Sequence, residues 1–156
     1  MTTAEQLVRK LSESGRTCCT AESCTGGGVG SEITSVPGSS AVFLGGVISY
    51  DNSVKSGVLG VSEEILATKG AVSSECACAM ADGVRRLLKA DFAISVTGIA
   101  GPGGGSAEKP VGLVWFALSS ERGTFAFRRT FAGGRAQVRD AAVHFAVELL
   151  AQAAAD

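Results

Sequence analysis

The sequence predicts an α/β fold, a three-layer α/β/α sandwich around a mixed, mostly parallel sheet with one β-hairpin. Strand-like apolar segments alternate with segments of helical periodicity, which is typical of a sheet covered by helices on both faces. Two further strand-like runs within 112–132 are separated only by Glu121, Arg122 and Gly123, the pattern of a hairpin. Since 156 residues with 46% apolar content suit one core, we expect a single domain over residues 1–156.

The first part of the chain predicts two helices with a strand between them. Apolar residues at 4, 7, 8 and 11 follow the helical i, i+3, i+4, i+7 rule, and Gly15 stands where that helix would stop. The segment 16–21 is strand-like. A helix from about Gly26 to Ser35 follows, and a Pro-Gly pair at 37–38 terminates it.

The middle of the chain predicts one strand followed by three helices. The stretch AVFLGGVISYDNSVKSG begins as a buried strand and turns at 51–52, where Asp and Asn are suited to cap a short helix that carries Lys55. Ser62 precedes a second short helix, and Ser73 or Ser74 caps a longer one. The expected core-facing residues of the long helix are Ala77, Met80, Ala81, Val84 and Leu88.

The last part of the chain predicts a strand, an irregular loop, the hairpin and a long helix. The segment DFAISVTG has the alternating residue pattern of a β-strand. It runs into the loop IAGPGGGSAEKPVG. This loop holds five of the 21 glycines and two of the three prolines, so we expect no helix in it. The final helix has His144 on a partly exposed side. Its expected core-facing residues are Val138, Ala141, Ala142, Phe145 and Leu149.

Composition argues against several classes of protein. The formal net charge is −1, the pI is about 5.9, and no Lys/Arg run exceeds two residues, so we expect no nucleic-acid partner. The longest apolar stretches are strand-length and the start has no signal-peptide pattern, so we expect no membrane partner and a cytoplasmic location. The five cysteines have no CxxC spacing and the only histidine is distant from them, so neither a metal site nor a disulfide is expected.

Three predicted strand ends carry unusual polar residues. They read AESCTGGG, ISYDNSVK and VTGIAGPGGG, and sites in α/β sheets form beyond the carboxyl ends of strands. Glycines before a helix let backbone N–H groups approach an anion, which the helix start also favours. Neither a dinucleotide fingerprint nor a P-loop is present, and taken alone the glycines fit tight strand-to-helix packing equally well.

Ser23 is the candidate nucleophile and Lys55 its candidate base. Because the only histidine lies in the last helix, a Ser–Lys pair fits better than a Ser–His–acid triad. A buried lysine loses proton affinity, which makes a neutral amine attainable near neutral pH. Lys55 stands beside Tyr50 at a strand end, although an ordinary solvated lysine is the alternative. Cys24 is the rival nucleophile, because a helix N-terminus lowers the pKa of a thiol.

Five ordered motifs resemble a known family. They are AESCTGG, VPGSSAVFLGGVISYDNSVK, GAVSSE, VTGIAGPGGG followed by KPVG, and GGRAQVR. They resemble the carboxy-terminal domain of the competence/damage-inducible CinA proteins, which also occurs as the stand-alone nicotinamide mononucleotide deamidase. The resemblance covers roughly residues 4 to 152 and leaves no room for the amino-terminal molybdopterin-binding-like domain of longer members. It implies an amidohydrolase that converts nicotinamide mononucleotide to nicotinic acid mononucleotide and ammonia, without a metal or nucleotide cofactor.

The resemblance also implies roles for individual residues. Ser23 matches the family's proposed serine nucleophile, Lys55 matches its general-base partner, and Tyr50 lies in the same catalytic site. Arg135 matches an arginine that can meet a substrate phosphate. The implied substrate-binding residues, with the loop glycines as candidate anion donors, are Gly26, Gly27, Ser39, Thr97, Gly98, Gly101 and Arg135.

Two positions depart from the family pattern. Gly134 stands where the family usually has an acid before the arginine, and Gly103 stands where it often has Asp. A non-catalytic nucleotide-binding or interaction module of the same fold is therefore the alternative function. The resemblance also implies a homodimer or larger homo-oligomer, and the alanine-rich helical faces at 74–89 and 136–153 are candidate contact surfaces.

Overall fold

The computed structural model describes all residues from 1 to 156. Helices and strands alternate along the first part of the chain, and a hairpin precedes the last helix. The helices are α1 (Thr3–Ser14), α2 (Gly28–Thr34), the 3-10 helix η1 (Ser39–Ala41), α3 (Asn52–Gly57), α4 (Glu63–Thr68), α5 (Ser74–Leu88) and α6 (Arg135–Ala155). The strands are β1 (Cys18–Glu22), β2 (Phe43–Ile48), β3 (Phe92–Gly98), β4 (Leu113–Ser120) and β5 (Gly123–Thr130).

The strands form one mixed sheet in the order β2-β1-β3-β4-β5. β1 pairs in parallel with β2 and β3, whereas β4 pairs antiparallel with β3 and β5. The predicted α/β class, mixed sheet and hairpin are confirmed. The register places Glu22 beside both Ile48 and Val96, so the three parallel strands end side by side.

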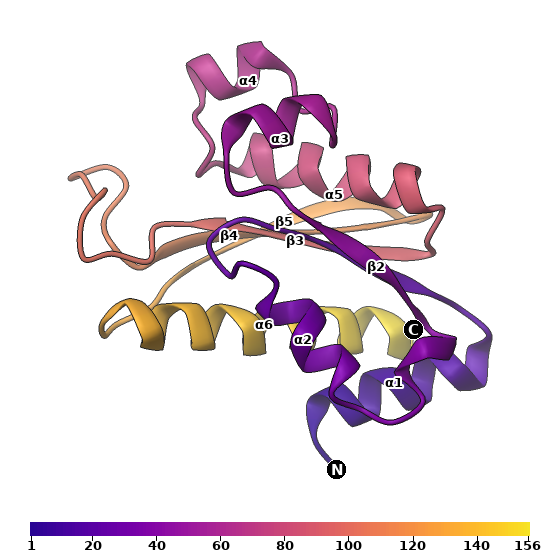
Figure 1. The fold of residues 1–156 in the computed structure, drawn as a ribbon. Coiled ribbons are helices and arrows are strands. Elements are labelled where there is room, and N and C mark those ends of the chain that lie inside the picture. Colours follow the sequence, from indigo (N-terminus) through magenta and orange to yellow (C-terminus); the bar gives the residue numbers. More distant parts are fainter.

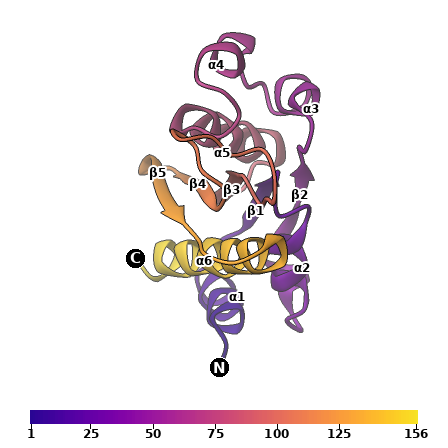
Figure 2. The same ribbon diagram turned by 90° about the vertical axis from the view of Figure 1, so that its left-hand side faces the viewer.

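Helices cover both faces of the sheet (Figures 1 and 2). Helices α1, α2 and α6 lie on one face, and α5 lies on the other with α3 and α4 beside it. The larger hydrophobic core joins α1 and α6 to one side of the strands, and a smaller core joins α5 to the other side. These two cores give the three layers that the sequence predicts.

Local sequence signals set most helix boundaries. Asp51, Ser62 and Ser73 each accept a backbone N–H in the first turn of α3, α4 and α5, as expected from the sequence. Gly15 ends α1 in the left-handed conformation, with φ 66°, which glycine adopts at little cost. None of the helices combines the length and hydrophobicity needed to cross a bilayer.

Three sequence expectations fail because of tertiary structure. β3 does not alternate, since all its residues but the last are buried beneath helices on both faces. The strand expected to be buried, β2, is an edge strand in which partly buried and exposed residues alternate. Helix α2 begins at Gly28 and not at Gly26, because Gly26 and Gly27 have positive φ values of 60° and 103°.

The alanine-rich faces of the two long helices pack inside the chain. Ala77 and Ala81 of α5 contact Ala117 of β4 in one small cluster. Ala142 and Ala146 of α6 belong to the larger core. These four alanines are therefore not available to contact a second subunit.

Candidate active site

The carboxyl ends of β1, β2 and β3 meet at a cavity of about 190 Å³. Its walls come from the residues after these strands, from α3, from the segment before α5 and from the start of α6. The predicted site residues that line it are Ser23, Tyr50, Lys55, Thr97, Gly98 and Arg135. The fold thus brings together residues that are up to 112 positions apart in sequence.

Ser23 and Lys55 lie within hydrogen-bonding distance of each other. Ser23 follows β1, and Lys55 lies in α3, which Asp51 caps. The distance from Lys55 Nζ to Ser23 Oγ is 3.1 Å. Both side chains are buried, with Ser23 8% and Lys55 1% exposed. Lys55 is therefore not the solvated lysine that the sequence left open.

Backbone carbonyls hold the Lys55 amine. Its Nζ donates to the carbonyl oxygens of Ser49 at 2.6 Å and Tyr50 at 3.0 Å. Burial lowers the pKa of Lys55 below its ordinary value of 10.5, because desolvation disfavours the ammonium. A neutral amine has two N–H bonds and one lone pair. When both N–H bonds are directed at the two carbonyls, the lone pair is left for the Ser23 hydroxyl, which suits proton transfer from Ser23 to Lys55.

Arg135 and Tyr50 form an exposed pair at the same cavity. Arg135 donates from Nη1 to the carbonyl of Gly101 at 2.9 Å and from Nη2 to the Tyr50 hydroxyl at 3.3 Å. Tyr50 is 62% exposed. A guanidinium has five N–H donors, so Arg135 retains donors for an incoming anion.

Thr97 and Gly98 shape the cavity from the end of β3. The Thr97 hydroxyl donates to the carbonyl of Ala71 at 2.9 Å and ties β3 to the segment before α5. A Cβ at Gly98 would lie 2.7 Å from Val114 Cγ2 and 2.8 Å from the carbonyl oxygen of Leu113. Only glycine fits this position without displacing β4.

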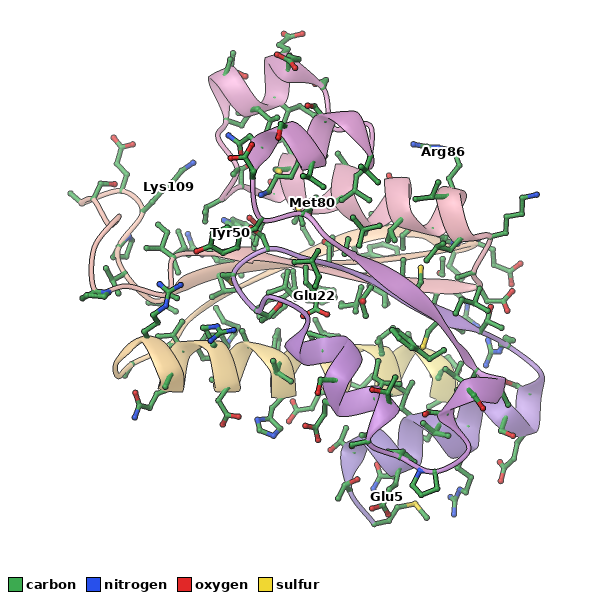
Figure 3. The ribbon with its side chains drawn as sticks, viewed as in Figure 1. Glu5, Glu22, Tyr50, Met80, Arg86 and Lys109 are labelled. Carbon is green, nitrogen blue, oxygen red and sulfur yellow. The ribbon has the colours of Figure 1, made fainter.

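Glu22 occupies the amino end of α2, where the sequence predicts a pocket for a ligand anion. The carboxylate accepts the backbone N–H of Val29 at 2.9 Å and of Gly30 at 3.0 Å, and the Thr25 hydroxyl at 2.6 Å. It is 2% exposed and lies between the sheet and α2 (Figure 3). The expectation of a ligand pocket at the helix start is thus corrected, because an internal carboxylate already satisfies these donors.

The turn Ser23–Gly27, which we call the nucleophile turn, is held from its other side by Arg139 of α6. Arg139 Nε donates to the carbonyl of Cys24 at 3.0 Å, and Nη2 donates to the carbonyl of Thr25 at 3.3 Å. The backbone N–H groups of Cys24 and Thr25, both buried residues, have no acceptor in the chain. The Gly26 N–H donates to the carbonyl of Ser23 at 3.1 Å. Gly26 and Gly27 shape this turn and do not line the cavity.

Cys24 is in a poor state for nucleophilic attack. Its thiol is buried, and desolvation raises its pKa to about 11, so it stays protonated at neutral pH. The rival assignment of Cys24 as the nucleophile therefore has little support. No three His, Cys, Asp or Glu side chains come together where they would hold a metal ion.

Ser39 lies away from the cavity. It begins η1, just before the amino end of β2, and the register places Phe43 of β2 beside Cys18 at the start of β1. The cavity is at the opposite ends of these strands. Within one chain, Ser39 is therefore separated from Ser23 by the length of the sheet.

Comparison with known proteins identifies the family. The family model for the CinA C-terminal domain matches residues 1–154. The chain belongs to the CinA C-terminal domain family. A relative from Escherichia coli (strain K12), named nicotinamide-nucleotide amidohydrolase PncC, is 48% identical over 153 residues, which cover 97% of this chain and 93% of the relative.

Longer members of the CinA C-terminal domain family also match. A CinA-like protein of Synechococcus sp. (strain CC9311) is 58% identical over 112 residues, 72% of this chain and 26% of that protein. Another, from Parasynechococcus marenigrum (strain WH8102), is 50% identical over 149 residues, 94% of this chain and 36% of that protein. The chain thus spans about a quarter to a third of the length of these relatives.

Solved structures of the family have the same fold. The competence/damage inducible protein CihA from Agrobacterium tumefaciens superimposes with a TM-score of 0.92 at 43% identity, over 100% of this chain and 98% of the other. A CinA superfamily protein from Klebsiella pneumoniae 700603 gives a TM-score of 0.94 at 35% identity, over 98% and 96% of the two chains.

Both departures from the CinA C-terminal domain pattern leave the local structure intact. Gly134 is the N-cap of α6, and its N–H donates to the side-chain oxygen of Gln137 at 3.1 Å. Arg135 reaches Gly101 and Tyr50 without an acid before it. No atom lies within 4 Å of the place where a Cβ on Gly103 would stand, so the loop has room for a larger residue.

Sequence reasoning missed Glu22 and Arg139. Glu22 ends a strand that is otherwise apolar or small, and a charge in such a strand needs an internal partner, which is a signal that points to it. Arg139 lies four residues after Arg135 in α6, so the two side chains share one face of the helix. Its partners on the nucleophile turn, however, depend on how α6 crosses the sheet, which no local pattern specifies.

Proposed function

We propose that this chain is a nicotinamide-nucleotide amidohydrolase that acts on nicotinamide mononucleotide through a Ser23 nucleophile and a Lys55 base. The observation that carries the proposal is the buried 3.1 Å contact between Lys55 Nζ and Ser23 Oγ in a cavity at the strand ends. The name of the PncC relative, which is similar over almost its whole length, supports the substrate class.

In the first half of the proposed reaction, Ser23 Oγ attacks the carboxamide carbon and its proton passes to Lys55. The carbonyl π electrons move to oxygen and give a tetrahedral oxyanion. The unpaired N–H groups of Cys24 and Thr25 are candidate donors to this oxygen, since they follow Ser23 directly. When the intermediate collapses, the C–N bond breaks and Lys55 delivers its proton to the departing ammonia.

In the second half, water hydrolyses the resulting ester between Ser23 and the nicotinoyl group. Neutral Lys55 takes a proton from the attacking water, and the same amine returns it to Ser23 Oγ as the acyl bond breaks. The three oxygens around Nζ can also accept the three N–H bonds of the ammonium. The same geometry therefore accommodates Lys55 in both protonation states of the cycle.

The size of the cavity supports a division of the substrate between a buried and an exposed part. Pockets that enclose drug-sized ligands have volumes of about 300–1,000 Å³, whereas this cavity has a volume of about 190 Å³. We expect the pyridine carboxamide to enter it and the ribose phosphate to remain outside. The exposed guanidinium of Arg135 is suited to bind the phosphate there.

The test of this proposal is ammonia release from nicotinamide mononucleotide. We expect turnover by the unaltered chain, and Ser23→Ala and Lys55→Met should each reduce kcat by at least about 10³-fold, because nucleophile and base act as a unit. Ser31→Ala and Lys89→Met, which alter exposed residues, are matched controls and should retain activity. Circular dichroism would verify that all four variants fold.

The alternative function has a different experimental outcome. A non-catalytic nucleotide-binding module would bind nicotinamide mononucleotide in calorimetry and release no ammonia at any enzyme concentration. Full activity of folded Ser23→Ala or Lys55→Met would instead refute the roles that we assign to these two residues.

A further inference from the structure

Opposite charges hold the nucleophile turn from two sides. On the α2 side, the Glu22 carboxylate accepts the Thr25 hydroxyl and the N–H groups at the start of α2. On the α6 side, the Arg139 guanidinium donates to the two consecutive carbonyls of Cys24 and Thr25. Of the residues in these contacts only Cys24 lines the cavity, so their direct effect is on the conformation of the turn.

Arg139 fixes the direction of the peptide groups that follow Ser23. In a trans peptide the C=O bond and the N–H bond of the next residue point in opposite directions. Because the carbonyls of Cys24 and Thr25 point at Arg139, the N–H groups of Thr25 and Gly26 point away from α6. The Gly26 N–H is already used by the Ser23 carbonyl, whereas the Thr25 N–H has no acceptor.

The unpaired donors are themselves a sign of function. Cys24 and Thr25 are both buried, and a buried backbone N–H without an acceptor is rare because its desolvation is not compensated. Here two such groups occur in succession, directly after the candidate nucleophile. Helix α6 and helix α3 lie on opposite faces of the sheet (Figure 1), so a group that points away from α6 points toward the side that supplies Lys55.

We infer that Arg139 is a positioning residue that holds the peptide group between Cys24 and Thr25 so that the Thr25 N–H stabilises the oxyanion formed at Ser23. This inference rests on the proposed amidohydrolase function and assigns a role to a residue that does not line the cavity. Glu22 holds the opposite side of the same turn. Loss of Arg139 would free the peptide groups to rotate and would weaken binding of the oxyanion but not of the planar amide.

The first measurement is steady-state kinetics on nicotinamide mononucleotide. We expect Arg139→Met to lower kcat by about 10²-fold, the effect of losing one oxyanion donor in other hydrolases, with KM changed less than about threefold. Arg139→Lys should recover part of the loss, because an ammonium can reach one of the two carbonyls but lacks the fork of a guanidinium. Arg9→Met, an exposed arginine on α1, is the matched control and should retain both constants.

The second measurement uses the pyridine-3-carboxaldehyde analogue of the substrate. Ser23 Oγ adds to the aldehyde carbon, the C=O π electrons move to oxygen, and the hydroxyl proton passes to Lys55, which gives a hemiacetal oxyanion without a leaving group. We expect Arg139→Met to raise the Kd of this analogue by about the same factor by which the substitution lowers kcat. Nicotinic acid mononucleotide forms no such adduct. The Kd of Arg139→Met for this product should therefore equal that of the unaltered chain.

The outcomes separate this inference from the proposed function. If the unaltered chain releases no ammonia, the amidohydrolase proposal fails and this inference fails with it. If the unaltered chain is active, two results would overturn the positioning role alone. One is an unchanged kcat of Arg139→Met, and the other is an equal rise in its Kd for the aldehyde analogue and for the product. If Arg139→Met does not fold, the same comparison is made with Arg139→Lys, for which an equal weakening of both ligands would overturn the role.

Discussion

Lys55 is buried, yet its amine contacts only uncharged oxygen atoms. No carboxylate lies within hydrogen-bonding distance to stabilise the ammonium, and desolvation lowers the pKa of the side chain. A lysine in this setting can act as a base at a pH where an exposed lysine is fully protonated. In the mechanism that we propose, Ser23 gains a proton acceptor in this way without a histidine.

The pH dependence of the reaction follows from the direction of this shift. Below its folded-state pKa, Lys55 is an ammonium and cannot accept the Ser23 proton, so kcat/KM should rise with pH and level off once the amine is neutral. We expect the midpoint of this rise to lie below 10.5, the ordinary lysine value. The control Lys89→Met should give the same pH profile of kcat/KM as the unaltered chain. A kcat/KM that does not change between acidic and alkaline pH would contradict the base role of Lys55.

Cys24 provides a second prediction for a single residue. Its thiol is buried and its pKa is raised to about 11, so we expect Cys24→Ala to keep kcat within about threefold of the unaltered chain. Treatment with iodoacetamide, followed by an ammonia-release assay, should likewise leave Cys24→Ala and the unaltered chain equally active. Loss of activity in Cys24→Ala, with the fold retained, would instead favour a cysteine nucleophile.

Among the secondary-structure elements, local signals predicted the most. Helix caps and stops depend only on neighbouring residues. They lie where the sequence indicates, with caps at Asp51, Ser62 and Ser73 and a stop at Gly15. The Ser23–Lys55 approach was also predictable, because strand ends in an α/β sheet converge. The same rule places Ser39, which precedes β2, at the opposite end of the strands, and its assignment to the site came from the family resemblance alone.

Helix α5 is packed closely enough for one added methyl group to disturb it. A Cβ at Gly83 would overlap the backbone carbonyl of Leu59. We expect Gly83→Ala to lower the free energy of unfolding by about 1–3 kcal/mol or more, measured by urea titration. Gly57→Ala in α3 is the matched control, since no atom lies near its added Cβ, and it should be neutral or stabilising by up to about 1 kcal/mol. Equal effects of the two substitutions would contradict this account.

The start of α6 allows a test of the first departure from the family pattern. Gly134 has an extended backbone that Asp can adopt, and Asp is a favoured N-cap. We expect Gly134→Asp to stabilise the protein by a few tenths of a kcal/mol, and to change KM less than about threefold because Arg135 is already held by Gly101 and Tyr50. A tenfold fall in KM would show that the missing acid matters for substrate binding.

At the scale of the whole molecule, three exposed apolar or aromatic residues follow one edge of the sheet. β2 is an edge strand without a charged residue, and Leu44, Ile48 and Tyr50 are exposed along it or just after it. Uncharged edge strands tend to pair with another strand, and a second copy of β2 presents the same unpaired edge. The homo-oligomer expected from the family resemblance would therefore form here more readily than through α5 or α6.

This expectation can be checked by multi-angle light scattering. We expect a dimer or larger species for the unaltered chain and a shift toward the monomer for Ile48→Lys, because a charge on each of two paired strands would repel. Leu87→Lys, which alters an exposed apolar residue on α5, is the matched control and should not change the mass. A monomer at every concentration, or no effect of Ile48→Lys, would contradict it.

The carbonyls that hold Lys55 belong to the main chain, and this has an evolutionary consequence. The oxygen at position 49 comes from the main chain, so a substitution that fits this buried position keeps the acceptor for the amine. The oxyanion donors that we propose after Ser23 are likewise main-chain atoms. Much of this chemistry is therefore inherited as backbone geometry, and a homologue with unfamiliar side chains at these positions can retain a working site.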